Sequence, residues 1–253
     1  MGVGLGLVAL IAMSAIAEAR IMKYRAGNIV FVDNGRFSPK KLPRHKKVPI
    51  SAFIFAAIQT ADGSHPPALE IVNIDFDRAF AVNAKGLPSC GKQQLENRTT
   101  TAAKRVCRQS IVGSGEASVE VAFPDQTPFT AKGPLLFFNG GVRGRTTFLF
   151  VHTYVAVPAP TAVVVPVKIT RIPHGVYGIH VVARIPRIAG GFGSAKRAKF
   201  TIKRRFTFRG KKKSYLSGSC PTKRSHVQVR GQALFADGTN VRLSRVLPCI
   251  PKG

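Results

Sequence analysis

The stretch AVVVPVKIT at residues 162–170 decides the fold class, because its side chains alternate in character with a period of two. Four β-branched residues share one parity, and the other parity carries a proline and polar side chains: Val163, Val165, Val167 and Ile169 against Pro166, Lys168 and Thr170. A period of two sends alternate side chains to opposite faces of a strand, and β-branched residues suit a pleated sheet. The stretch therefore predicts a strand with one buried face.

The same alternation recurs outward from this stretch, around residues 119–123, 177–185 and 227–235. Two further runs, ISAFIFAAI at 50–58 and TTFLFVHTYV at 146–155, are apolar on both faces and predict central strands. One short helix is predicted near residues 99–107, with Thr99 as its cap. About a dozen strands with a single helix indicate an all-β fold, a β-sandwich of Ig-like or jelly-roll-like type.

The N-terminus predicts export. Residues 3–17 are apolar and end in small-x-small sites, so we expect a signal peptide over 1–19, cleaved after Ala17 or Ala19, in a secreted or cell-envelope protein. A short membrane anchor or a buried segment are the alternatives. We expect two packed β subdomains after it: 20–157, with a helix insert between Cys90 and Cys107, and a basic subdomain over 158–253. A single elaborated sandwich over 20–253 is the alternative.

Four cysteines are present, and none forms a C-x-x-C pair that would indicate zinc or redox chemistry: Cys90, Cys107, Cys220 and Cys249. An even number together with an export signal predicts disulfides in an oxidising compartment. Three connectivities are possible, and one of them joins each cysteine to its nearer neighbour in sequence. Four reduced thiols in a cytosolic protein are the alternative.

The charge is the most unusual property of the composition. The formal net charge is +28, and residues 126–253 hold 23 Lys and Arg against a single carboxylate, Asp237. Such a field attracts polyanions in a salt-dependent way, whether nucleic acid, anionic lipid headgroups or acidic wall polymers.

The densest basic stretch is KRAKFTIKRRFTFRGKKK at residues 196–213. One parity carries the apolar residues Phe200, Ile202, Phe206 and Phe208, which predicts that they are core residues rather than a base-stacking platform. The candidate polyanion-binding residues are the cations of the other parity and those of the following turn: Lys199, Lys203, Arg205, Arg209, Lys211, Lys212 and Lys213. A solvated face that protects an edge strand is the alternative. We expect no dedicated nucleic-acid reader, because no recognised motif is present.

Catalytic and metal-binding patterns are weak. The six histidines match no common zinc spacing, and Ser114 in VGSGE does not fit the nucleophile elbow, so we expect a non-enzymatic protein without metal or cofactor. Asp75 and Asp77 in IVNIDFDRAF are two residues apart on one predicted strand. They could act as an acid/base pair of a glycan-active enzyme or bind Ca²⁺ weakly, but salt bridges with Arg78 and other cations are the simpler interpretation.

Several segments together resemble a family of secreted bacterial proteins with no assigned function, from about Ile29 to the C-terminus: FSPKKLPRHKKVPISAFI, ADGSHPPALE, KGLPSC, IVGSGEA, AFPDQTPF, SYLSGSCP and FADGTNVRLSRVLPC. The resemblance implies export, a β-rich fold and two local disulfides, and it implies no catalytic residue. The leading hypothesis is a secreted, non-enzymatic protein that binds an anionic polymer through the basic face of 196–213. A structural or adhesive protein-binding module with incidental charge is the second hypothesis, and a glycan-active enzyme is the third.

Overall fold

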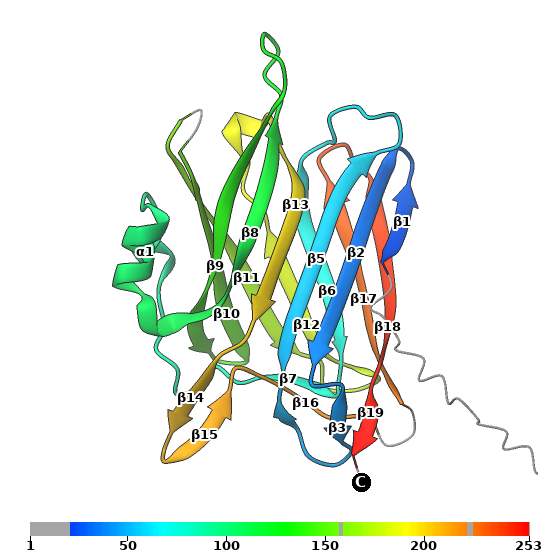
Figure 1. Cartoon of the computed structure of the whole chain (residues 1–253), viewed down its shortest axis with the longest axis vertical. Helices are drawn as coiled ribbons and strands as arrows, with labels where there is room; N and C mark the ends of the chain where they lie inside the picture. Colours follow the sequence, from blue (N-terminus) through cyan, green and yellow to red (C-terminus); the bar gives the residue numbers. More distant parts are fainter. Residues whose placement is uncertain (1–20, 157–158, 222–224, 253) are drawn as a thin grey trace, which may run out of the picture.

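The structure, a computed structural model, describes residues 21–156, 159–221 and 225–252, so the predicted signal peptide over 1–19 lies outside the described residues. Most of the described chain is β-strand, which confirms the all-β fold, and one antiparallel sheet of twelve strands dominates it (Figure 1). The strands, in their order across this sheet, are β1 (Met22–Ala26), β2 (Ile29–Ser38), β5 (Ser51–Thr60), β13 (Gly193–Ile202), β8 (Ile111–Val121), β9 (Phe129–Arg143), β10 (Thr146–Val155), β11 (Thr161–Arg171), β12 (Tyr177–Arg184), β6 (Leu69–Asp77), β17 (His226–Phe235) and β18 (Asn240–Pro248).

The large sheet folds over on itself into the two packed layers of a sandwich. Strands β1, β2, β5, β13, β8 and β9 form one layer, and the remaining six lie behind it (Figure 1). The two edge strands, β1 and β18, meet side by side. Their junction is held by side chains: the Tyr24 hydroxyl donates to the Ser244 carbonyl at 2.6 Å, and Arg245 Nη1 lies 2.9 Å from Asp33 Oδ2. Two apolar clusters fill the space between the layers.

Strands from the two halves of the chain are interleaved in this sheet. Strand β13, from the C-terminal half, lies between β5 and β8, and β6, from the N-terminal half, lies between β12 and β17. A division near residues 157–161 would therefore separate hydrogen-bonded neighbours on both sides of β13 and on both sides of β6. The two halves of the chain therefore contribute strands to one common sheet.

Three small sheets extend the lower end of the molecule in Figure 1. They are the parallel pair β3 (Lys41–Pro43) and β19 (Ile250–Lys252), the three strands β4 (Val48–Pro49), β16 (Leu216–Gly218) and β7 (Phe80–Val82), and the hairpin β14 (Arg205–Phe208) and β15 (Lys211–Ser214). The disulfide Cys220–Cys249 lies in the apolar cluster beneath the first two of these sheets.

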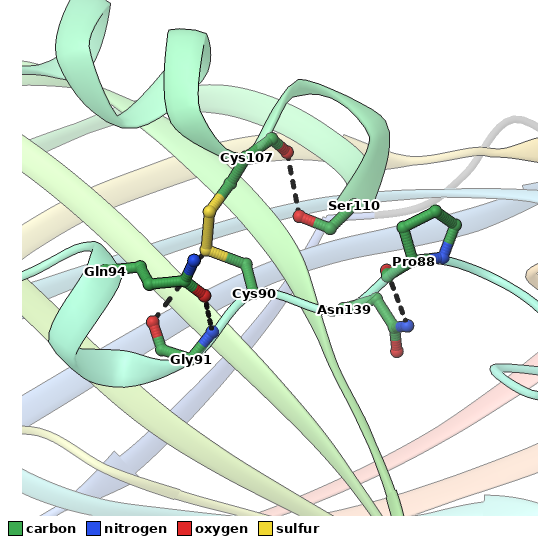
Figure 2. Close-up of a disulfide and its surroundings, with 7 residues drawn as sticks. All are labelled: Pro88, Cys90, Gly91, Gln94, Cys107, Ser110 and Asn139. Carbon is green, nitrogen blue, oxygen red and sulfur yellow. Dashed lines mark hydrogen bonds between the residues drawn. A yellow bond between two sulfur atoms is a disulfide. The ribbon is translucent and has the colours of Figure 1, made fainter.

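The helix lies outside the sandwich, against β9 and β10. Helix α1 (Thr100–Val106) begins where predicted, because the Thr99 hydroxyl accepts a hydrogen bond from the Ala102 amide at 3.2 Å. Short 3₁₀ turns flank it, η1 (Lys92–Gln94) and η2 (Arg108–Ser110), and a third, η3 (Ala189–Gly191), precedes β13. The disulfide Cys90–Cys107 closes this segment (Figure 2). Both disulfides thus join the cysteines that are nearest in sequence.

The segment closed by Cys90–Cys107 covers part of the outer face of the sheet, and this changes the burial expected from alternation. The buried Asn139 side chain of β9 donates to the carbonyls of Leu87 and Pro88 at 3.1 and 3.0 Å, which fixes the start of the segment (Figure 2). In β11, Val167 and Ile169 enter the interior as predicted. Val164, of the opposite parity, is also buried, because it packs beneath the helix segment.

No helix among the described residues is long and apolar enough to cross a membrane.

Candidate functional site

The basic stretch 196–213 belongs to two separate sheets. Alternation predicts one strand over 199–209, but β13 ends at Ile202, and a new strand, β14, begins at Arg205. Arg204 lies at this break, where its Nη2 donates to the Gln109 carbonyl at 3.3 Å. The predicted turn is also displaced: Arg209 and Gly210 form it, each with a positive φ, and Lys211–Ser214 is the returning strand. The prediction that residues 199–209 form one strand with a continuous row of outward cations is therefore wrong.

The predicted cations accordingly fall into two groups. Lys199 lies on the outer face of the large sheet, in register with Phe55 of β5 and Glu116 of β8. The other six lie on the linker and hairpin over residues 203–213, which we call the basic hairpin: Lys203, Arg205, Arg209, Lys211, Lys212 and Lys213. All of these are exposed except the half-buried Lys213, and none makes an ion pair with a carboxylate of the described residues.

Phe208 attaches the basic hairpin to the body of the protein. Its ring lies against Gly86, where a Cβ would be only 2.2 Å from Phe208 Cδ2. The cations Arg209 and Lys213 lie over the same ring, at 5.4 and 4.9 Å from its centroid. Phe206 packs on the main core, as its parity predicted. The hairpin is thus seated by its aromatic residues, and its cations other than Lys213 are exposed.

A cavity of about 700 Å³, which we call the end cavity, opens beside the basic hairpin at the same end of the sandwich. Its apolar wall includes Val82, Ala84, Ile169 and Ile179, and the last three belong to the main core. Six cations line it, and no carboxylate does: Lys47, Arg78, Lys85, Arg145, Arg171 and Lys213. Lys213 joins the end cavity to the basic hairpin.

Two of these cations have structural roles. Lys47 Nζ donates to the carbonyls of Arg78 and Phe80 at 2.7 and 2.8 Å. Arg78 Nε donates to the Gly175 carbonyl at 2.8 Å and so holds the β11–β12 turn. Burial lowers the pKa of Lys47, and the charges of Arg171 and Arg78 lower it further, although Asp77 opposes them. Lys47 is therefore close enough to Arg171 and Arg78 to be repelled by them.

Arg145, in the β9–β10 turn, and Arg171, the last residue of β11, lie at the same end of the paired strands β10 and β11. Thr146 of β10 is the register partner of Thr170 of β11, and Arg145 and Arg171 are the next residues outward on the same two chains. Thr147 and Ile169, which are partners of the same parity as this pair, also line the end cavity. Like charges that lie near one another repel. Among the described residues, neither guanidinium group makes a hydrogen bond or ion pair.

The two candidate catalytic carboxylates, Asp75 and Asp77, make contacts away from the end cavity. The pair Asp75 and Asp77 expected on one strand face is divided: Asp75 contacts His180 Nδ1 at 2.7 Å and Arg230 Nε at 2.9 Å on the outer face. Asp77 is buried and accepts hydrogen bonds from the backbone amides of Ala79 and Gln228. The expected salt bridge of Asp75 forms, but its cationic partner is Arg230 rather than Arg78, and His180 also contacts the same carboxylate. The acid/base pair of a glycan-active enzyme is therefore not assembled at these two residues.

Ser194, His65 and Glu120 form a serine–histidine–carboxylate contact that no sequence motif predicted. His65 Nε2 lies 3.1 Å from Ser194 Oγ, and His65 Nδ1 lies 3.0 Å from Glu120 Oε1. The Ser194 side chain is buried, and its hydroxyl donates to the Pro66 carbonyl, so the proton points away from the imidazole. A nucleophilic serine requires the opposite direction and an accessible oxygen. The contact instead ties the loop at residues 65–66 to β8 and β13.

Glu120 is also the acceptor of an ion pair from Lys196, at 3.2 Å. Burial acts to raise the pKa of the Glu120 carboxyl, but hydrogen bonds from His65 and Lys196 outweigh it and hold the pKa below its ordinary value. In the part of the chain that the structure describes, no group of three or more His, Cys, Asp or Glu side chains is placed to hold a metal ion.

Sequence patterns singled out the cations of the basic hairpin, although not its geometry, and missed five of the six cations of the end cavity. The only sequence feature that could have pointed to them is that Arg145 and Arg171 lie just beyond the ends of predicted strands. It is the register between β10 and β11 that places these two residues at the same end of the sheet. Comparisons with protein-family models, with curated proteins and with solved structures found no match for this chain.

Proposed function

We propose that this is a secreted, non-enzymatic protein of the cell envelope or exterior, which binds an anionic polymer through the basic hairpin. The observation that carries the proposal is the concentration of exposed cations on residues 203–213, with no carboxylate of the described chain paired to them. Packing of Phe206 and Phe208 against the body gives these cations a fixed base. An external polyanion would supply the missing negative charge.

The shape of the cationic surface favours a polymer over a small anion at the hairpin. Exposed ion pairs contribute little individually, roughly 0 to 1 kcal/mol each, so useful affinity requires many of them at once. The hairpin carries its cations on two strands and on the turn between them, which suits an extended chain of negative charges. Lys199, on the large sheet, would add a separate contact.

The test is binding of the purified mature protein to isolated cell walls, intact and stripped of anionic polymer, across a salt series. We expect binding that falls steeply with salt and disappears on stripping. The triple variant Arg205→Gln, Lys211→Gln, Lys212→Gln should bind more weakly and with a shallower salt dependence, because fewer counterions are released.

The matched control removes the same number of charges from the exposed surface around helix α1, as Lys104→Gln, Arg105→Gln, Arg108→Gln. It should bind nearly as well as the wild type. Equal loss in both triple variants would show that net charge alone governs binding and would refute the assignment to the hairpin. Binding that barely responds to salt would favour a protein-binding module instead.

A further inference from the structure

The end cavity differs in chemistry from the basic hairpin, because it combines charge with an apolar interior. Its floor reaches the core residues Ile169 and Ile179, while its lining also carries the six cations. A cavity of about 700 Å³ has the size typical of sites for small organic ligands, which are mostly apolar with a few polar groups that fix orientation. A polymer segment that carries only charges would leave the apolar floor unmatched.

The charge pattern indicates the kind of anion. Arg145 and Arg171 lie at the same end of the paired strands β10 and β11, and both line the cavity without a hydrogen-bond or ion-pair partner among the described residues. Guanidinium groups present parallel N–H donors that match phosphate or carboxylate oxygens two at a time. Lys85 and Lys213 line the same cavity and add two further charges. This excess of positive charge favours a phosphoryl group, which carries nearly two negative charges at neutral pH, over a carboxylate.

We propose that the end cavity binds an amphiphilic phosphate, with the phosphoryl group held between Arg145 and Arg171 and the apolar part seated against Ile169, Ile179 and Val82. The bound anion relieves the repulsion between the two arginines. This site goes beyond the proposed polymer binding and uses different residues, apart from the shared neighbour Lys213.

The experiment is calorimetric titration of the wild-type protein with three probes: inorganic phosphate, and octyl phosphate and octyl glucoside below their critical micelle concentrations. Octyl phosphate should bind at least about 10-fold more tightly than either of the others, because only it satisfies both the cations and the apolar floor. Comparable affinity for inorganic phosphate would overturn the amphiphilic part of the proposal and leave a phosphate site. No binding of octyl phosphate would overturn the proposal as a whole.

The variants Arg145→Gln and Arg171→Gln should each weaken octyl phosphate by about 10- to 100-fold, as expected for loss of hydrogen bonds to a charged group. The matched control is Arg143→Gln at the end of β9, next to the same turn, since Arg143 lies over the Phe148 ring and does not line the cavity. An equal loss in the control would show a general charge effect and would overturn the site.

A second measurement needs no ligand. Arg145→Gln should raise the urea midpoint of the unliganded protein slightly, because it removes one of the like charges gathered at the cavity, whereas Arg143→Gln should not. The triple hairpin variant at Arg205, Lys211 and Lys212 should keep its affinity for octyl phosphate, so failure of wall binding and failure of this site are distinguishable.

Discussion

Replacing Gly86 by alanine tests how the basic hairpin is seated. Gly86 has a φ of +89°, and a Cβ there would lie 2.2 Å from Phe208 Cδ2. The left-handed backbone costs an alanine about 1–2 kcal/mol, and forcing the Phe208 ring to move adds about 1–3 kcal/mol of overpacking. We therefore expect Gly86→Ala to lower the free energy of unfolding by roughly 2–5 kcal/mol.

Two comparisons separate these contributions in urea unfolding followed by circular dichroism. Gly238 has a similar φ, +85°, and a Cβ there would meet nothing within 4 Å, so Gly238→Ala should show only the backbone cost of about 1–2 kcal/mol. In a Phe208→Ala background, Gly86→Ala should also fall to this smaller cost. If Gly86→Ala costs the same in both backgrounds, Phe208 does not rest on Gly86, and the reasoning fails.

Three further predictions concern the disulfide and two titrating groups. Replacing Cys90 and Cys107 together by alanine should lower the free energy of unfolding by about 3 kcal/mol, measured by urea unfolding, because the cross-link closes a separation of 17 residues. Burial lowers the pKa of His152 in the folded state, so the unfolded chain binds a proton at a higher pH and stability should fall as the pH drops below about 6.5. The variant His152→Gln can still donate to the Arg98 carbonyl, and its urea midpoint should change less between pH 7.5 and 5 than that of the wild type. The folded-state pKa of Glu120 is held low, so its contribution to the free energy of unfolding is present above about pH 4.3 and is lost as the pH falls through that folded-state pKa. Glu120→Gln should therefore make stability less dependent on pH in acid, measured by urea unfolding, and an unchanged pH dependence would contradict the ion pairs proposed for Glu120.

The local structure of the fold was largely predictable. Alternation placed Val167, Ile169 and Phe200 toward the interior, and a threonine before an alanine-containing run located helix α1. Alternation failed for Val164, because its burial depends on a helix segment that comes from elsewhere in the chain. Period-two patterns report which face of a strand is apolar, and they carry no information on what covers the other face.

Which strands and loops lie next to one another could not be predicted from the sequence. The break at Arg204 interrupts the apolar parity by one residue only, yet it moves the following strand into another sheet. The end cavity depends on register between β10 and β11 and on the approach of distant segments such as Lys47 and Lys213. Such long-range pairings are set by the whole core, so spacing along the chain does not reveal them.

The insertion of β13 and β6 among distant strands also constrains how the protein is made. Strand β5 can pair on its second edge only after β13 has been synthesised, and β13 begins at Gly193. Strand β6 can pair with β17 only after residues from His226 onward have been made. A growing chain therefore carries unsatisfied strand edges for most of its synthesis, and sheets built from non-local pairs assemble slowly. Unfinished chains with exposed edges are prone to join one another. Most of the net charge of +28 comes from residues 126–253, so mutual repulsion between unfinished chains grows as the later strands are made.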